Sequence, residues 1–187
     1  VEKVNSVLAA GRDDTARVQT NPLIRRLHLV DERNFTATVL GAWLSRSLNS
    51  WAVELQRAGR IREAATHFAK ALALNPDNIP AKINLQFNAD LQAGRPSSVR
   101  VTEDIEDAFG RYRGWEQIIN ANGLFDEPQF TASLGEVFAR GRLLRQAYRE
   151  FDRARVLDPR NFTAQLYFAR LSAALGRPQD ALDVVKD

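Results

Sequence analysis

The chain has 187 residues, of which 44% are hydrophobic and 26% are charged. This apolar content suffices for a buried core and excludes wholesale disorder. The absence of cysteine excludes disulfide frameworks, zinc–thiolate sites and cysteine nucleophiles, and only two histidines are present. The net charge is +3, with 26 basic residues against 23 acidic ones distributed along the chain. We therefore expect a soluble helical module that binds no nucleic acid, needs no cofactor or metal, and inserts no segment into a membrane.

Residues 1–34 are predicted to hold a degenerate helical repeat, whose second helix runs from Asn21 to Val30. From Phe35 to Ala58 no proline interrupts the chain, and apolar residues recur on one helical face. This run predicts one long helix.

The first clear helix pair follows, within residues 45–78. Its second helix carries Ala64, Phe68 and Ala71 at helical spacing, which predicts one apolar stripe. Gly59 is suited to the turn before this helix, and Pro76 cannot continue it. Such a pair cannot cover its own apolar face, so neighbouring pairs must stack.

A second unit, residues 79–127, is longer than the others. The spacing from Pro76 to Pro159 exceeds twice the spacing from Ala147 to Ala181, which is the length of one regular unit. The excess is predicted to be a helical insertion, capped by Thr102 and ended by Asn122-Gly123.

Two further units are predicted at 128–161 and 162–187, the last of them truncated. Pro128 is placed to open the first, since proline is tolerated in the first turn of a helix. Ala147 and Ala181 occupy the same position in these two units. Asn78 and Asn161 stand where helices should begin and are predicted N-caps.

These motifs resemble the tetratricopeptide repeat (TPR), a family of 34-residue helix–turn–helix units. The resemblance is carried by A-x3-F followed by proline eight residues later, by Leu134-Gly135-x2-Phe138, and by the links Ala71–Pro76 and Ala154–Pro159. It implies an all-α fold, a right-handed superhelical array of antiparallel helix pairs (an α-solenoid). It covers residues 45–93 and 128–187 well and the rest poorly.

No arrangement of reactive side chains predicts an enzyme. The acidic run from Glu103 to Asp107 is interpreted as a helix N-terminus with solvated carboxylates. Arg145, Arg149 and Arg153 point away from the apolar stripe of their helix and are interpreted as a solvated outer face, although they are also candidates to grip phosphate or an acidic peptide.

The TPR resemblance also implies a binding surface. In such arrays the first helix of each unit lines a concave groove that takes up an extended peptide or a partner helix. Carried over position by position, the groove residues are Arg46, Asn49, Val53, Gln56, Ile83, Phe87, Asp90, Glu136, Arg140, Thr163, Leu166 and Arg170.

The insertion offers a second candidate surface. Phe109, Tyr112 and Trp115 are residue types that dominate binding hot spots. The alternative is that these aromatic side chains fill the irregular gap between neighbouring units, and both interpretations remain open at this point.

We expect a non-catalytic module that binds another protein or a peptide. The alternatives are an assembly or self-association segment of a larger, membrane-anchored or secreted bacterial protein whose catalytic domain lies elsewhere, or an enzyme built on a repeat scaffold. The chain starts at Val1 and ends inside an apolar-periodic stretch at Asp187, which is typical of a piece of a longer protein. The open C-terminal helix face is then a candidate homodimer contact, and the arginine-rich composition favours a bacterial source, in the cytoplasm or the periplasm.

Overall fold

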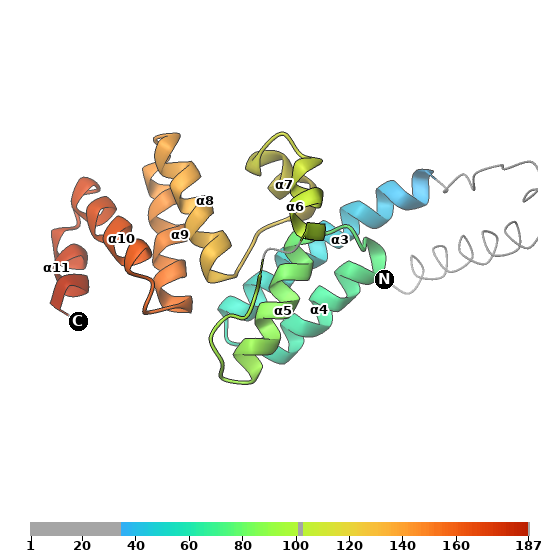
Figure 1. Cartoon of the computed structure of the whole chain (residues 1–187), viewed down its shortest axis with the longest axis horizontal. Helices are drawn as coiled ribbons and strands as arrows, with labels where there is room; N and C mark the ends of the chain where they lie inside the picture. The colour runs from blue at the N-terminus through green and yellow to red at the C-terminus, as the bar shows by residue number, and fades with distance from the viewer. Residues whose placement is uncertain (1–34, 101–102, 187) are drawn as a thin grey trace, which may run out of the picture.

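A computed structural model of the chain describes residues 35–100 and 103–186. Every regular element in these ranges is an α-helix. The helices are α3 (Phe35–Arg57), α4 (Ile61–Leu74), α5 (Ile79–Gln92), α6 (Glu103–Gly110), α7 (Trp115–Asn122), α8 (Pro128–Arg140), α9 (Leu144–Leu157), α10 (Phe162–Ala174) and α11 (Pro178–Lys186). They follow one another along the long axis of the molecule, with α6 and α7 set to one side (Figure 1). The predicted all-α class is confirmed, and the arrangement is compatible with an α-solenoid.

Some predictions lie outside the described residues. These are the degenerate repeat in residues 1–34 and the N-cap at Thr102. Within the described ranges, no helix combines the length and the apolar character needed to cross a membrane.

The chain contains an internal repeat, in which α3, α4 and α5 correspond to α8, α9 and α10. Helices α4 and α9 both have 14 residues, and their C-cap residues have nearly the same backbone angles, φ −139° and ψ 96° in one and φ −139° and ψ 93° in the other. Asn78 and Asn161 then cap α5 and α10, each accepting a hydrogen bond from a backbone N–H three residues later. The N-cap prediction is confirmed at both positions. Aligning Pro76 with Pro159 brings the two halves into this register.

Packing within each pair follows the predicted stripes. In α4 and in α9 the buried positions form the same A-x3-F-x2-A pattern, which is Ala64, Phe68 and Ala71 in one helix and Ala147, Phe151 and Ala154 in the other. The facing helix needs a small residue opposite the phenylalanine. A Cβ atom added to Gly135 of α8 would lie only 2.9 Å from the Phe151 ring. Glycine is therefore required there for the close approach of the two helices.

The first helix, α3, is the predicted uninterrupted run. It has 23 residues, and its C-terminal half buries Ala52, Val53 and Leu55. Its first turns carry exposed apolar side chains, including Phe35 and Trp43. The part of α3 that packs in the core is thus the part that pairs with α4.

The insertion is two short helices and not the single predicted run. Helix α6 ends at Gly110, and α7 begins after Gly114, whose backbone is extended with φ 167° and ψ 173°. No atom lies within 4 Å of a Cβ built on either glycine, so the break is not caused by close packing. Asn122 ends α7 as predicted, and Pro128 opens α8.

Candidate functional site

Most of the groove residues predicted in the first half are buried by the chain itself. Six of them have at most 2% of their surface exposed, namely Asn49, Val53, Gln56, Ile83, Phe87 and Asp90. Their assignment to an open groove is therefore wrong. For the residues on the facing sides of α3 and α5, the cause is the segment from Asn122 to Asp126, which lies against these helices. Asp90 is instead covered by the loop after α5, where it bonds to Arg95 and Ser98.

This segment, which we call the resident segment, is held through its main chain. Asn49 of α3 donates from Nδ2 to the carbonyl oxygens of Asn122 and Leu124, both at 3.0 Å. Asn84 of α5 donates to the Leu124 carbonyl at 2.9 Å and accepts from the Asp126 N–H at 2.7 Å. Alternate carbonyls of the resident segment thus face amide side chains of α3 and α5.

Further amide groups complete the main-chain contacts. Asn78 donates from Nδ2 to the Asn122 carbonyl at 3.1 Å, besides capping α5. Gln56 donates to the Asp126 carbonyl at 3.1 Å. Asn88 supports Gln56 by donating to its Oε1 at 2.8 Å. Buried amides are costly unless they are hydrogen-bonded. This network therefore fixes the position of the resident segment relative to α3 and α5.

The resident segment has no room for a side chain at Gly123. Its φ is +91°, and an added Cβ would lie 2.8 Å from Asn49 Nδ2 and 2.9 Å from Ser50 Oγ. Two residues later, Phe125 is fully buried and stacks on Phe130 with ring centroids 5.1 Å apart. Glycine at one position and an apolar anchor at the other fix the register of the segment.

Asp126 ends the resident segment in a buried charge cluster. Its carboxylate accepts from Arg153 Nε at 2.8 Å and Nη2 at 2.7 Å, and from Arg57 Nε at 3.1 Å. Gln56 Nε2 adds a fourth bond at 2.8 Å. Asp126 itself is fully buried, and Arg153 keeps 18% of its side-chain surface exposed. The interpretation of Arg153 as part of a solvated outer face is therefore wrong, because its guanidinium joins α9 to the first half.

Three carboxyl groups near these contacts have perturbed pKa values. Burial raises the pKa of the Glu150 carboxyl beside the Asp126 cluster, and the negative charge of Asp126 adds to this. Burial also raises the pKa of Glu127, which accepts from the Phe130 N–H and from the Ser97 hydroxyl. Hydrogen bonds from Ser98 lower the pKa of Asp90, which anchors the loop after α5.

The insertion aromatics pack in the core and also reach a surface groove. Tyr112 accepts a hydrogen bond from Asn122 Nδ2 at 2.9 Å and packs against the apolar cluster around Phe125. Trp115 contacts Phe125 edge-on, with ring centroids 5.5 Å apart. It is only partly buried, and with Phe109 it forms one wall of the groove. The gap-filling interpretation therefore fits Tyr112, while Trp115 and Phe109 both fill the gap and present a surface.

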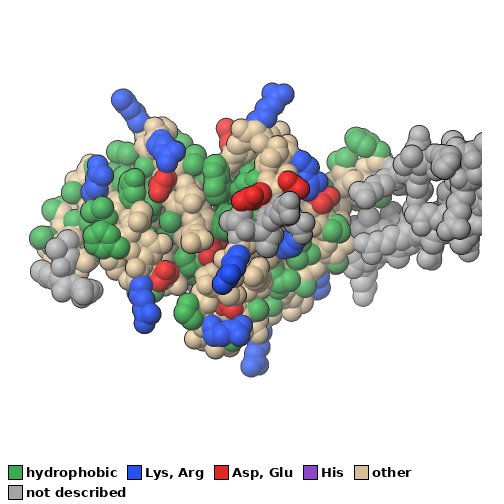
Figure 2. Space-filling model, viewed as in Figure 1, with side chains coloured by type: hydrophobic (Ala, Val, Ile, Leu, Met, Phe, Trp, Pro, Cys, Tyr) green, Lys and Arg blue, Asp and Glu red, His purple; other side chains and the backbone are tan. Residues whose placement is uncertain are grey.

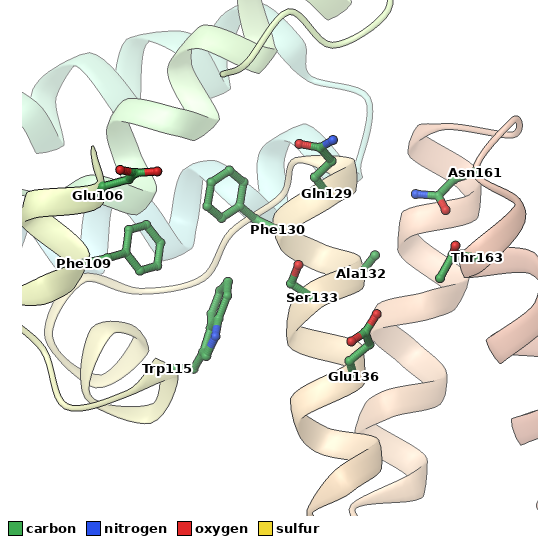
Figure 3. Close-up of a pocket in the computed structure, with 10 residues that line it drawn as sticks. All are labelled: Glu106, Phe109, Trp115, Gln129, Phe130, Ala132, Ser133, Glu136, Asn161 and Thr163. Carbon is green, nitrogen blue, oxygen red and sulfur yellow. The ribbon is translucent and has the colours of Figure 1, made fainter. Parts of the chain in front are cut away.

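This groove has a volume of about 590 Å³. Helix α8 forms its floor, and the aromatic side chains of the insertion and the start of α10 flank it (Figure 3). We call it the α8 groove, and its lining residues are Glu106, Phe109, Trp115, Gln129, Phe130, Ala132, Ser133, Glu136, Asn161 and Thr163.

Only part of the predicted groove set lies in or beside this opening. Glu136 and Thr163 line it. Arg140 donates to Glu136 at 2.8 Å, at the end of the floor helix. The others lie elsewhere on the surface: Leu166 is exposed on α10, Arg170 lies over the Tyr167 ring, 5.9 Å from its centroid, and Arg46 lines a separate hollow beside Trp51.

Sequence reasoning missed two kinds of residue. It did not assign Gln129, Phe130, Ala132 and Ser133 to a binding surface, although they lie on the same helix as Glu136. It also missed the resident segment. Asparagines on the inward faces of α3 and α5 were the available signal, because amides are unusual at fully buried helix positions.

The α8 groove is lined by charged and polar side chains as well as apolar ones. Its titratable side chains are two carboxylates, Glu106 and Glu136, and Ser133 and Thr163 add hydroxyl groups to the lining. In the residues that the structure describes, no three histidine or carboxylate side chains gather as metal ligands do. On the face shown in Figure 2, lysine and arginine side chains project singly and form no continuous basic stripe.

No protein-family model matches the chain, and no curated protein matches it.

Proposed function

We propose that this protein is a non-catalytic interaction module, a TPR-like right-handed superhelical array that binds a segment of another protein in the α8 groove. The observation that carries this proposal is the internal repeat. In the register that aligns Pro76 with Pro159, three α3 residues at the resident segment correspond to three α8 residues that line an open groove. One bonds to the segment, the backbone carbonyl of another lies beside Gly123, and the third belongs to the apolar cluster against which Leu124 packs. The α3 residues are Arg46, Asn49 and Val53, and their α8 counterparts are Gln129, Ala132 and Glu136.

The same position in the fold is thus occupied by peptide in one half and open in the other. Aromatic side chains flank the open copy, and buried or half-buried aromatics are the residues on which protein binding most often depends. Partly exposed Trp115 and Phe109 supply such anchors. An apolar wall beside a floor that carries Gln129, Ser133 and the carboxylate of Glu136 suits a short peptide with one or two apolar side chains.

Selection of displayed peptides against the chain, followed by binding measurements with groove variants, tests this proposal. Ser133 is exposed on α8, so Ser133→Tyr fills the groove without disturbing the core. We expect this substitution to lower the affinity for the selected peptides at least about tenfold, which is about 1.4 kcal/mol of binding free energy. The melting temperature of the chain should not change.

The matched control is Gln146→Tyr, at an exposed position of α9 that does not line the groove. It should leave peptide affinity unchanged. If both variants bind the selected peptides as tightly as the natural chain, the α8 groove is not the binding site.

A further inference from the structure

The position of one asparagine indicates which conformation of a ligand the α8 groove recognises. This inference rests on the proposed function. Asn161 caps α10 by accepting from the Ala164 N–H at 3.0 Å through Oδ1. Its Nδ2 group has no hydrogen-bond partner among the described residues, and the side chain lines the groove. Figure 3 shows it at the start of α10, beside the floor helix.

In the equivalent residue of the first half, both the oxygen and the nitrogen of the side-chain amide form hydrogen bonds. Asn78, which corresponds to Asn161 in the internal repeat, caps α5 through Oδ1 in the same way. Its Nδ2 donates to the Asn122 carbonyl of the resident segment at 3.1 Å, and to Ser45 Oγ at 2.9 Å. The cap fixes the side chain, so its Nδ2 is held in place before any ligand binds.

A second equivalence lies at the other end of the groove. Arg57, at the end of α3, donates to the carboxylate of Asp126, four residues after Asn122 in the resident segment. Its counterpart in the internal repeat is Arg140, at the end of α8, with 77% of its side-chain surface exposed. Arg140 forms its ion pair with Glu136 on its own helix, and an exposed pair of this kind contributes little to stability.

We infer that the α8 groove binds an extended peptide and not a helix, with Asn161 Nδ2 donating to one main-chain carbonyl and Arg140 binding a carboxylate four residues further along. A helical ligand uses its interior carbonyls in its own hydrogen bonds, so it has none to offer Asn161 along the groove. The ligand is therefore a segment with an acidic side chain near its C-terminal end, running from the start of α10 towards the end of α8.

The probe is a synthetic heptapeptide, acetyl-Ala-Asn-Gly-Leu-Phe-Asp-Glu-amide, which copies residues 121–127. It is titrated into the whole chain while the side-chain amide signals are followed by NMR. We expect saturable shifts of the Asn161 signal, while the signals of Asn49 and Asn84, already bonded to the resident segment, do not move.

Two substitutions test the two contacts. Asn161→Ser keeps a capping oxygen but removes the Nδ2 group, and we expect at least fivefold weaker binding with unchanged melting. The control Asn120→Ser changes an exposed asparagine of α7 outside the groove and should bind normally. Replacing the aspartate of the probe by asparagine should weaken its binding to the natural chain severalfold. The same replacement should leave binding to the Arg140→Gln variant unchanged.

Failure of this inference is distinct from failure of the proposed function. If selected peptides bind in the α8 groove but the heptapeptide does not, or binds Asn161→Ser as tightly as the natural chain, then the groove is a binding site that does not read an extended main chain. If the aspartate and asparagine probes bind equally, Arg140 has no role in recognition.

Discussion

At the residue scale, Gly123 shows how strongly one position can depend on its neighbours. It combines φ +91° with ψ −171°, a region that is accessible essentially to glycine alone. Its missing Cβ also leaves the space that Asn49 and Ser50 occupy. Conformation and packing therefore both exclude larger residues at this point.

Gly123→Ala is expected to lower the free energy of unfolding by at least about 3 kcal/mol, from backbone strain together with displacement of the Asn49 amide. Gly59→Ala is the matched control, since Gly59 has φ +76° with nothing within 4 Å of an added Cβ. It should cost only about 1 kcal/mol. Urea unfolding measures both, and equal losses would mean that the contact with Asn49 contributes nothing.

A second residue, Glu150, makes stability depend on pH. Its folded pKa lies above the ordinary value of 4.5 because burial disfavours the charged form. Between these two pKa values the native state binds more protons than the unfolded state, so the free energy of unfolding falls as pH rises through this window. Oε2 of this carboxyl has no hydrogen-bond partner in the described structure, which adds to the cost of its charge.

Glu150→Gln should therefore stabilise the chain relative to the natural protein, and by more near pH 7 than near pH 4. Denaturant unfolding at both pH values measures the difference. Glu116→Gln, at an exposed site of α7, should show no such dependence. A variant that is less stable at both pH values would mean that attraction to Arg57, Arg153 and Arg149 outweighs the cost of burial.

At the scale of elements, helix periodicity and capping residues predicted most of what is seen. The long α3, the A-x3-F stripes of α4 and α9, and the start of α8 at Pro128 all follow from local patterns. The insertion departs from its prediction because an apolar period carries across Gly110 and Gly114 although the backbone does not stay helical there. Periodicity reports which residues face the core, and it is insensitive to a short break between two helices.

The two asparagine caps offer a matched pair of substitutions. Asn161→Ala removes a single capping bond and should cost about 1 kcal/mol. Asn78→Ala removes the same cap and also two buried hydrogen bonds, to Ser45 and to the Asn122 carbonyl, so we expect about 3 kcal/mol. Urea unfolding of both variants compares them. Similar costs would show that the bonds to the resident segment add no stability.

At the scale of the whole molecule, residues distant in sequence set the relative placement of the two halves. Asp126 lies between Arg57 of α3 and Arg153 of α9 and binds both. No local pattern predicts this cluster, since Arg153 lies on the polar side of its helix and Asp126 in a short connection. Of the groove residues predicted on α8, Glu136 lines the α8 groove. The resident segment was not predicted, because only the folded chain brings it to α3 and α5.

Arg153→Leu should lower the free energy of unfolding by about 3 kcal/mol, because it leaves the buried Asp126 carboxylate with one arginine. Hydrogen exchange should rise in α8 and α9 more than in α4, since the contact joins the halves. Arg149→Leu, at an exposed position one turn earlier on α9, is the control and should change stability by less than about 0.5 kcal/mol. Equal effects of the two substitutions would exclude Asp126 as the link.

The correspondence between the two halves has a practical consequence for ligand design. In the register that aligns Pro76 with Pro159, α3 residues beside the backbone of Asn122–Asp126 correspond to α8 residues that line the α8 groove. The conformation of that backbone is therefore a starting template for a synthetic peptide to test against the groove. The side chains of such a peptide can then be varied to fit the aromatic wall of the groove. The resident segment shows, in the same molecule, how the fold holds a backbone of this conformation.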